Sequence, residues 1–542
     1  MNKKTVFVLC LLSLVLSASA EIPLDRSVMS EKYWAIWNDD VQKRIDADIE
    51  KYRKADASFA VDAPEGTTVS VEQMTHAFYF GAHIFNFDQL GTHARNVAYK
   101  KLWGAEGALF NSGTVAFYWR TFEPYQGATR FRTAYEDTET FWNDCKNPKL
   151  QPHWRRPATD APIAFLKSRG CRVHGHPLAW GNLSWMTPAW LWSEFCPQSE
   201  KDALFAATGV KIAENDLLEG RPGVKGSWKG SWTKAWKKVF EKLTAEQIAE
   251  ILPTFTARYN ALYQKRVREI CEHYGTRVDS WDVVNESSSQ YSAAVGVETG
   301  RALECNSHYG LMPGDFTLSA FRWAQAALPK KGEGRGLLNL NDYANGTNYI
   351  AQVKDLLAHG AEVEVLGCQM HLFNPKDATA IAEGTANISP GKAAGSPADT
   401  YARFLPLCDL NLPIHLSEIT ITAAGENSPR DQMIQANIAR NLYRIWFSIP
   451  KMFAITWWNV VDDCGAPGEP SYSGIFTRDM KPKPAYYELD RLINREWRTK
   501  CEVKVEGQGQ QRTVSFRGFR GKYRLTWKDA DGKEQTKLVE LK

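Results

Sequence analysis

The chain has 542 residues and a mass of 61.2 kDa, too long for one minimal domain but suited to a barrel with smaller attachments. With 44% hydrophobic and 24% charged residues, it is expected to be globular, and the composition excludes an intrinsically disordered chain. The formal net charge of +4 is too small for a polyanion-binding surface, so no nucleic-acid partner is expected.

Residues 1–20 have the pattern of a secretory signal peptide. Lys3 and Lys4 give a positive start, an apolar run follows, and the segment ends in the small residues 18–20 that signal peptidase cuts after. We therefore expect a mature chain from about Glu21 that is exported, either to the periplasm or to the medium. No later run has ~18 uninterrupted apolar residues, so no membrane span is expected.

The cysteine and aromatic contents add two expectations. Of the ten cysteines, Cys10 would leave with the signal peptide, and the odd remainder includes at least one thiol without a partner in the chain. No CxxC pair indicates a zinc site. The 20 Trp and 20 Tyr supply flat amphipathic rings, which either fill cores or stack on the faces of sugars.

The N-terminal part of the mature chain predicts one helix and one β-ribbon. Apolar residues spaced by three or four predict a helix over residues 28–55. Residues 58–61 and 68–73 predict two strands, and the turn residues 64–66 between them indicate that the strands pair as a ribbon.

From Ala77 onward, short apolar runs alternate with helical segments, which is typical of a parallel α/β sheet or barrel. Eight such runs match the strand number of a TIM (β/α)8 barrel, so we predict an α/β fold of that type. The predicted strands are residues 78–85, 108–115, 171–178, 278–286, 336–342, 363–371, 413–418 and 453–460.

The predicted domain organisation follows from these elements. A signal peptide (1–20) precedes the N-terminal helix and ribbon (21–74), the catalytic barrel (75–497) and a small C-terminal β appendage (498–542). The barrel has insertions near 137–160 and 193–243, and the second contains a Trp- and Lys-rich segment, KGSWKGSWTKAWKK. This segment could contact a substrate or only cover the surface. The appendage could bind sugar, but packing on the barrel is the simpler expectation.

Several predicted strands finish with polar or aromatic residues, and in a TIM barrel such strand ends form the active-site face. These residues are His176, Glu286, Asp342, His371, Glu418 and Trp458. Glu286 would follow the fourth strand and Glu418 the seventh, so both carboxylates would face one cleft. Two such acids can hydrolyse a glycosidic bond with retention, one as proton donor and the other as nucleophile. Either acid alone would more often be a strand cap or a salt-bridge partner.

Residues 75–495 resemble glycoside hydrolase family 10, the retaining endo-β-1,4-xylanases. The resemblance is carried by six segments in the order of the family. They are HGHPLAW (174–180), WDVVNE (281–286), GCQMH (367–371), HLSEITI (415–421), ITWWNVVDD (455–463) and SGIFTRDMKPKPAYY (473–487).

The resemblance implies roles for individual residues. Glu286 would be the acid/base and Glu418 the nucleophile, which His371 would orient and hold ionised. Trp458 would form the apolar wall of the sugar site, although Trp457 is an equally plausible wall. Asp342 is the carboxylate that most strongly rivals the two glutamates as a catalytic residue. The substrate-binding residues would be Asn285, His176, Trp180, Gln369, His371, Tyr343 and Trp458.

The sequence departs from the family's pattern around this catalytic pair. After the second strand, where the family has a polar Glu-Asn and Lys cluster that grips the sugars on the non-reducing side, residues 115–118 are Val, Ala, Phe and Tyr. Gly181 stands where the family has a second His, and Thr420 where an Asp usually follows the nucleophile. The chemistry is therefore expected to be retained, while the substrate could be a branched xylan or a different β-linked polysaccharide.

The leading hypothesis is an exported retaining endo-1,4-β-xylanase that acts on a polysaccharide as a monomer. It needs no metal or organic cofactor, because two carboxyl groups supply the acid, the base and the nucleophile. Hydrolysis of another β-linked glycan is the alternative within the same chemistry. A non-catalytic glycan-binding protein is the alternative outside it.

Overall fold

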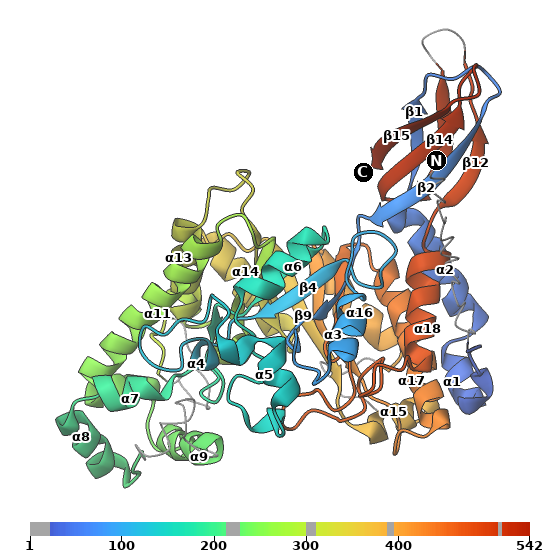
Figure 1. The fold of residues 1–542 in the computed structure, drawn as a ribbon. Coiled ribbons are helices and arrows are strands. Elements are labelled where there is room, and N and C mark those ends of the chain that lie inside the picture. The colour runs from blue at the N-terminus through green and yellow to red at the C-terminus, as the bar shows by residue number, and fades with distance from the viewer. Residues whose placement is uncertain (1–21, 213–227, 300–310, 387–394, 508–511) are drawn as a thin grey trace, which may run out of the picture.

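The computed structural model describes residues 22–212, 228–299, 311–386, 395–507 and 512–542 (Figure 1). The predicted signal peptide and the first part of the Trp- and Lys-rich segment lie outside these residues. Within them, no helix combines the length and the apolar character that crossing a membrane requires. The cysteines of the described part are all free thiols.

Eight parallel strands close into a barrel, which confirms the predicted TIM fold. Each predicted strand forms, with ends shifted by a few residues. Closure comes from the pairing of the third and fourth barrel strands, His174 with Ser280 and Gly175 with Trp281. A two-residue strand, β6 (Ala179–Trp180), adds to the fourth. The barrel strands are β3 (Tyr79–His83), β4 (Ser112–Ala116), β5 (Arg172–His176), β7 (Ser280–Asn285), β8 (Leu337–Asp342), β9 (Val365–Leu372), β10 (Ile414–Ile421) and β11 (Met452–Trp457).

Helices surround the barrel and fill its connections (Figure 1). They are α3 (His93–Lys100), α4 (Trp119–Phe122), α5 (Glu139–Asp144), α6 (Asp160–Ser168), α7 (Ala189–Phe195), α8 (Gln198–Thr208), α9 (Trp228–Phe240), α10 (Ala245–Ile251), α11 (Pro253–Tyr274), α12 (Gly296–Thr299), α13 (Phe316–Ala327), α14 (Thr347–Ala358), α15 (Pro375–Ala382), α16 (Pro397–Cys408), α17 (Pro429–Ser448) and α18 (Pro484–Arg491). Short 3-10 turns lie at Arg26–Val28, Tyr135–Asp137, Pro148–Leu150 and Ser288–Gln290, and a π-helical turn at Leu492–Glu496.

The predicted N-terminal helix is divided into two, α1 (Glu31–Ile36) and α2 (Asp39–Arg53). The break occurs because the Asn38 side chain caps the second helix, accepting a hydrogen bond from Val41 N at 3.1 Å. Both helices cover the outer face of α17, where Asn441 donates to Tyr33 and Arg444 pairs with Asp46. Most residues of α17 are buried as a result.

The predicted β-ribbon near the N-terminus is wrong in its pairing. Both strands form, as β1 (Lys54–Ala60) and β2 (Thr68–His76), but they do not pair with each other. Instead β1 pairs with β13 (Thr513–Phe519), and β2 lies between β12 (Lys500–Lys504) and β14 (Gly521–Lys528). Strand β14 also pairs with β15 (Glu534–Leu541) as a hairpin. Their apolar faces form one small core that includes Val71, Val514, Tyr523 and Leu525. The N-terminal strands and the C-terminal appendage are thus one β unit.

This β unit joins the barrel at the end where the strands begin, and stands away from it in Figure 1. Trp497, which is buried, stacks on Phe447 of α17 with ring centroids 4.1 Å apart and on Phe80 at 5.7 Å. Phe80 is the second residue of β3, and Phe519 of β13 lies against Phe447. The β unit therefore lies at the opposite end of the barrel from the carboxyl ends of the strands.

Candidate active site

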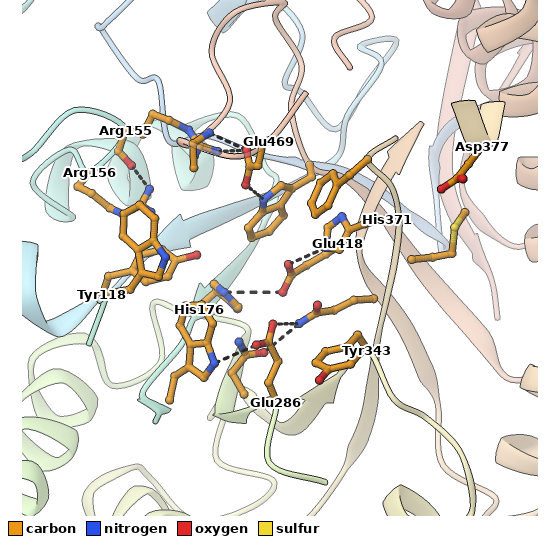
Figure 2. A pocket seen from close by; sticks show the side chains of 18 of the residues that line it. Tyr118, Arg155, Arg156, His176, Glu286, Tyr343, His371, Asp377, Glu418 and Glu469 are labelled. Carbon is orange, nitrogen blue, oxygen red and sulfur yellow. Dashed lines mark hydrogen bonds and ion pairs between the residues drawn. The ribbon is translucent and has the colours of Figure 1, made fainter. Parts of the chain in front are cut away.

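A cavity of about 570 Å³ opens at the carboxyl ends of the barrel strands, shown from close by in Figure 2. It is lined by every residue that the sequence assigned to the site. These are Glu286, Glu418, Asn285, His176, Trp180, Gln369, His371, Tyr343 and Trp458. The barrel closure brings them together from strands β5 to β11, which are far apart in the sequence.

Glu286 follows β7 directly and has a backbone φ of 56°. This left-handed conformation is uncommon outside glycine, and in functional sites it serves to aim a side chain. Trp180 Nε1 donates to its Oε2 at 3.1 Å, and Gln369 Nε2 donates to its Oε1 at 3.1 Å. Burial, reinforced by the negative charge of Glu418, raises the pKa of Glu286 to about 8. At neutral pH this carboxyl group therefore carries a proton.

Glu418 lies within β10, not at its end, because the strand continues to Ile421. The pairing of β10 with β9 shifts register between Leu416 and Glu418, and such a bulge redirects side chains. Asn341 Nδ2 donates to Glu418 Oε1 at 2.9 Å. Burial raises the pKa of Glu418 to about 7, opposed by His176. Its pKa thus lies below that of Glu286, so Glu418 loses its proton first.

Two amide side chains connect the carboxyl groups. Asn285 Oδ1 accepts from Asn341 Nδ2 at 2.9 Å and from Gln369 Nε2 at 3.2 Å. The same two donors also bond Glu418 and Glu286 respectively. The network fixes the orientation of the Asn285 amide between the two acids. Asn341, to which the sequence assigned no role, thus holds Glu418 in place.

His371 contacts Glu418 from the β9 side. Its Nε2 lies 3.3 Å from Glu418 Oε2, and its Nδ1 lies 2.9 Å from Thr420 Oγ1. Burial lowers the pKa of His371 to about 4, so the ring is neutral near pH 7. The hydroxyl of Thr420 offers it no negative charge, and His371 acts on Glu418 only through a neutral hydrogen bond.

His176 contacts Glu418 from the opposite side. Its Nδ1 lies 2.7 Å from the buried Asp282, which also accepts from His174 at 2.9 Å, and its Nε2 is 3.7 Å from Glu418 Oε1. Burial alone would raise the pKa of Asp282, but the two histidines hold it well below its usual range. Asp282, to which the sequence assigned no role, therefore orients His176 toward Glu418.

Two choices left open by the sequence are decided by the structure. Asp342 does not line the cavity, and its carboxylate accepts the backbone N–H groups of Ser288 and Ala344, each at 2.9 Å. It shapes the turn after Glu286. Trp457 is fully buried and donates to backbone carbonyls, whereas Trp458 faces the cavity and forms its wall.

A group of charged residues with no role expected from the sequence also lines the cavity. Arg155 and Arg156 come from the insertion near 137–160, Glu469 from the segment after β11, and Arg403 from α16. Arg155 pairs with Glu469 at 3.5 Å, and Glu469 also accepts from Trp458 Nε1 at 3.3 Å. Burial alone would raise the pKa of Glu469, but Arg155 and the hydrogen bonds lower it to about 2. In the sequence, the two arginines are visible only as part of the run HWRRP (153–157), which lies in an insertion without an expected role.

The larger insertion near 193–243 contributes differently. None of its described residues lines the cavity. Trp236 is fully buried, with its ring 5.4 Å from Trp192 and 6.5 Å from Phe255. This tryptophan of the Trp- and Lys-rich segment therefore forms core. The segment's residues 225–227 lie outside the described part of the chain.

Comparison with known proteins adds independent information. The sequence profile of glycosyl hydrolase family 10 matches residues 228–491. Endo-1,4-beta-xylanase C of Paenibacillus barcinonensis is 25% identical over 324 residues, covering 51% of this chain and 27% of that protein. Endo-1,4-beta-xylanase A of Caldicellulosiruptor saccharolyticus is 24% identical over 250 residues, covering 42% of this chain and 65% of that protein. The match thus spans less than two thirds of the length of either relative.

Solved structures include xylanase 10B from Thermotoga petrophila RKU-1 in complex with xylobiose. It is 19% identical, with a TM-score of 0.45, over 78% of this chain and 95% of that one. The profile match includes both Glu286 and Glu418. Residues 228–491 of this chain therefore match glycosyl hydrolase family 10, the family whose motifs the sequence resembles.

Proposed function

We propose that this protein hydrolyses β-1,4-xylosidic bonds inside xylan with retention of configuration. The observation that carries the proposal is the pairing of Glu286 and Glu418 on one cavity, joined through Asn285, with both pKa values raised but to different extents. A protonated and an ionised carboxyl group beside one another are what retaining hydrolysis requires.

In the first step, ionised Glu418 attacks the anomeric carbon and forms a covalent ester with the sugar. The glycosidic C–O bond breaks, and Glu286 transfers its proton to the leaving oxygen. In the second step, ionised Glu286 takes a proton from water. The resulting oxygen attacks the same carbon, the ester breaks, and Glu418 leaves as a carboxylate.

Xylan is the proposed substrate because the matched relatives are named as xylanases and the sugar-facing residues Asn285, His176 and Trp458 are present. The cavity departs from the family's pattern where Tyr118 stands at the position of a polar cluster, and Arg155 and Arg156 also line it. This departure favours a substituted xylan or, as a second candidate, another β-linked glycan. A panel of β-1,4-xylan, β-glucan and mannan separates the two by relative rate.

The test is the release of reducing ends from xylan by Glu418→Gln and Glu286→Ala. The rate of reducing-end release by each variant is expected to be lower by at least about a thousandfold, since each substitution removes a group used in the transition state. Glu426→Gln is the matched control, because Glu426 is an exposed glutamate that follows β10. This variant should retain full activity. Unchanged release by either active-site variant would overturn the assignment.

We further propose that the protein is exported by residues 1–20 and acts as a monomer. The support for export is the signal-peptide pattern, and the support for a monomer is that one chain supplies all the residues of the cavity. N-terminal sequencing from the native host should give a start near Glu21. Light scattering of the purified protein should give the mass of one chain.

A further inference from the structure

Arg156 is a buried cation on the wall of the active-site cavity. Its side chain is only 6% exposed, and it comes from the connection between β4 and β5. The guanidinium lies 3.9 Å from the ring centre of Tyr118, 5.1 Å from that of Trp185 and 5.2 Å from that of Phe85. Three aromatic rings thus hold the guanidinium in place and keep water from most of its surface.

This cation lacks an acidic partner. Within the part of the chain that the structure describes, Arg156 forms no ion pair, and its Nη1 donates only to the backbone oxygen of Arg155 at 2.7 Å. Its Nε is buried without a hydrogen-bond acceptor. A guanidinium has five N–H donors, so most of its hydrogen-bonding capacity is unused. Burying such a group without an acceptor is unfavourable, which indicates an acceptor that arrives with a ligand.

The neighbouring charges do not neutralise Arg156. Glu469 is the acidic residue of this wall, and its carboxylate is engaged by Arg155 at 3.5 Å, by Asn459 Nδ2 at 2.9 Å and by Ala466 N at 2.7 Å. Arg155 also donates to Asn459 Oδ1 at 2.9 Å. Two arginines and one glutamate leave this wall with one positive charge in excess.

The position of Arg156 relative to the reacting bond follows from a chain of contacts. Tyr118, on which Arg156 stacks, lies 5.6 Å from the His176 ring, and His176 lies 3.7 Å from Glu418. Figure 2 shows Arg155 and Arg156 on one side of Glu418, with Glu286 and Tyr343 on the other. Since Glu286 protonates the leaving group, the arginines lie toward the sugars that remain bound to Glu418.

We propose that Arg156 binds the carboxylate of a hexuronic acid carried by the glycan on this side of the cleavage point. The inference rests on the proposed glycoside hydrolysis and specifies the substrate as an acidic, substituted xylan. An arginine fork matches the two oxygens of a carboxylate, and exclusion of water strengthens such a charge-assisted pair. A neutral sugar hydroxyl would leave the charge of Arg156 uncompensated.

The test compares two xylo-oligosaccharides that differ only in charge. One carries a glucuronic acid branch, and the other carries the same branch with its carboxyl group reduced to a primary alcohol. The native enzyme is expected to show a kcat/KM at least tenfold higher for the acidic oligosaccharide. Arg156→Met should reduce this preference to less than threefold, and Arg156→Lys, which keeps the charge but not the fork, should give an intermediate preference.

Arg132→Met is the matched control, because Arg132 is an exposed arginine of the same connection and its loss should leave the tenfold preference intact. Equal kcat/KM values of the native enzyme for the two oligosaccharides would overturn the proposal. So would an undiminished preference in a folded Arg156→Met variant.

Calorimetric binding to Glu418→Gln keeps the proposal testable if the Arg156 variants do not fold. This protein should bind the acidic oligosaccharide at least tenfold more tightly than the reduced one, and equal affinities would overturn the proposal. Binding and cleavage together separate the proposed role of Arg156 from the proposed hydrolysis. Failure of the native enzyme to cleave either oligosaccharide would overturn the proposed hydrolysis, while the difference in binding would still decide the role of Arg156.

Discussion

Glu286 and Glu418 differ in the groups that surround them, and this difference assigns their roles. Glu286 accepts from two neutral donors, Trp180 and Gln369, which do little to offset its burial. Glu418 lies between two histidines and accepts from Asn341, so its charged form is better stabilised. The pKa of Glu418 therefore lies below that of Glu286, and between about pH 7 and pH 8 Glu418 is the more ionised of the two.

The pH dependence of kcat/KM should reflect these two groups. Activity requires ionised Glu418, so it is expected to fall as the pH decreases below about 7. It also requires protonated Glu286, so it is expected to fall again as the pH rises through about 8. Rates on a soluble xylo-oligosaccharide between pH 5 and pH 10 would check the profile. A plateau that extends well above pH 8 would contradict the role of Glu286.

Thr420 offers a second test at the residue scale. Thr420→Asp should place a carboxylate beside His371 Nδ1, raise the pKa of that ring and bring a positive charge to Glu418. The pKa of Glu418 would then decrease, and the acidic limb of the kcat/KM profile should move to lower pH by about half a unit or more. Thr420→Asn keeps the shape without the charge. Identical profiles for the two variants would show that His371 does not tune the nucleophile.

The position of Glu286 and Glu418 on one face of the barrel could be predicted from the sequence, because each follows a run that is typical of a buried strand. The choice between Trp457 and Trp458 could not, since β11 ends at Trp457 and the alternation of a strand does not extend to the next residue. Arg156 could not be recognised either. It lies in an insertion without periodicity, and its importance depends on contacts with Tyr118 and Trp185 that only the fold creates.

At the scale of elements, the connection after β11 supports the wall of the cavity. Its Glu469 accepts hydrogen bonds from Trp458 Nε1 and Asn459 Nδ2 and pairs with Arg155. These contacts fix the ring of Trp458 and tie this connection to the insertion that follows β4. The wall therefore depends on two segments that are remote in sequence.

Glu469→Gln should loosen this wall. A neutral amide cannot satisfy all these donors and leaves Arg155 without its counter-charge, so kcat/KM on xylan is expected to fall about tenfold to a hundredfold. Steady-state kinetics would measure the loss, with the exposed change Glu426→Gln as control. Kinetics equal to the native enzyme would show that Trp458 is held by packing alone.

The barrel strands were predictable because buried parallel strands are short, nearly continuous apolar runs. The N-terminal helix was predicted as one element because its apolar spacing runs through residue 37. The cap at Asn38 that divides it is a local hydrogen bond, which periodicity does not report.

At the scale of the whole molecule, the two ends of the chain form one β unit. Strand β1 pairs with β13, and β2 with β12 and β14, so pairing partners are more than 400 positions apart. The alternation in each strand was visible in the sequence, but alternation identifies a strand and not its partner. The turn at residues 64–66 favoured a local ribbon, and the burial of one shared core decided otherwise.

Trp497 tests how this β unit is joined to the barrel. Trp497→Ala should remove its stacking on Phe447 and Phe80 and lower the free energy of unfolding by about 3–5 kcal/mol. The kcat/KM on xylan should stay within about twofold, since the change lies at the opposite end of the barrel from Glu418. Urea unfolding and kinetics would measure both, with Trp497→Phe as a milder replacement. A large loss of activity in the folded variant would show coupling between the two ends.

In the proposed mechanism, Glu418 and Glu286 act in turn on one anomeric carbon. Proton NMR of a xylo-oligosaccharide during the first minutes of hydrolysis tests it most directly, because the configuration of the new reducing end is seen before it equilibrates. Two inversions at that carbon predict that the β-anomer appears first and the α-anomer only later by mutarotation. Initial formation of the α-anomer would contradict the account.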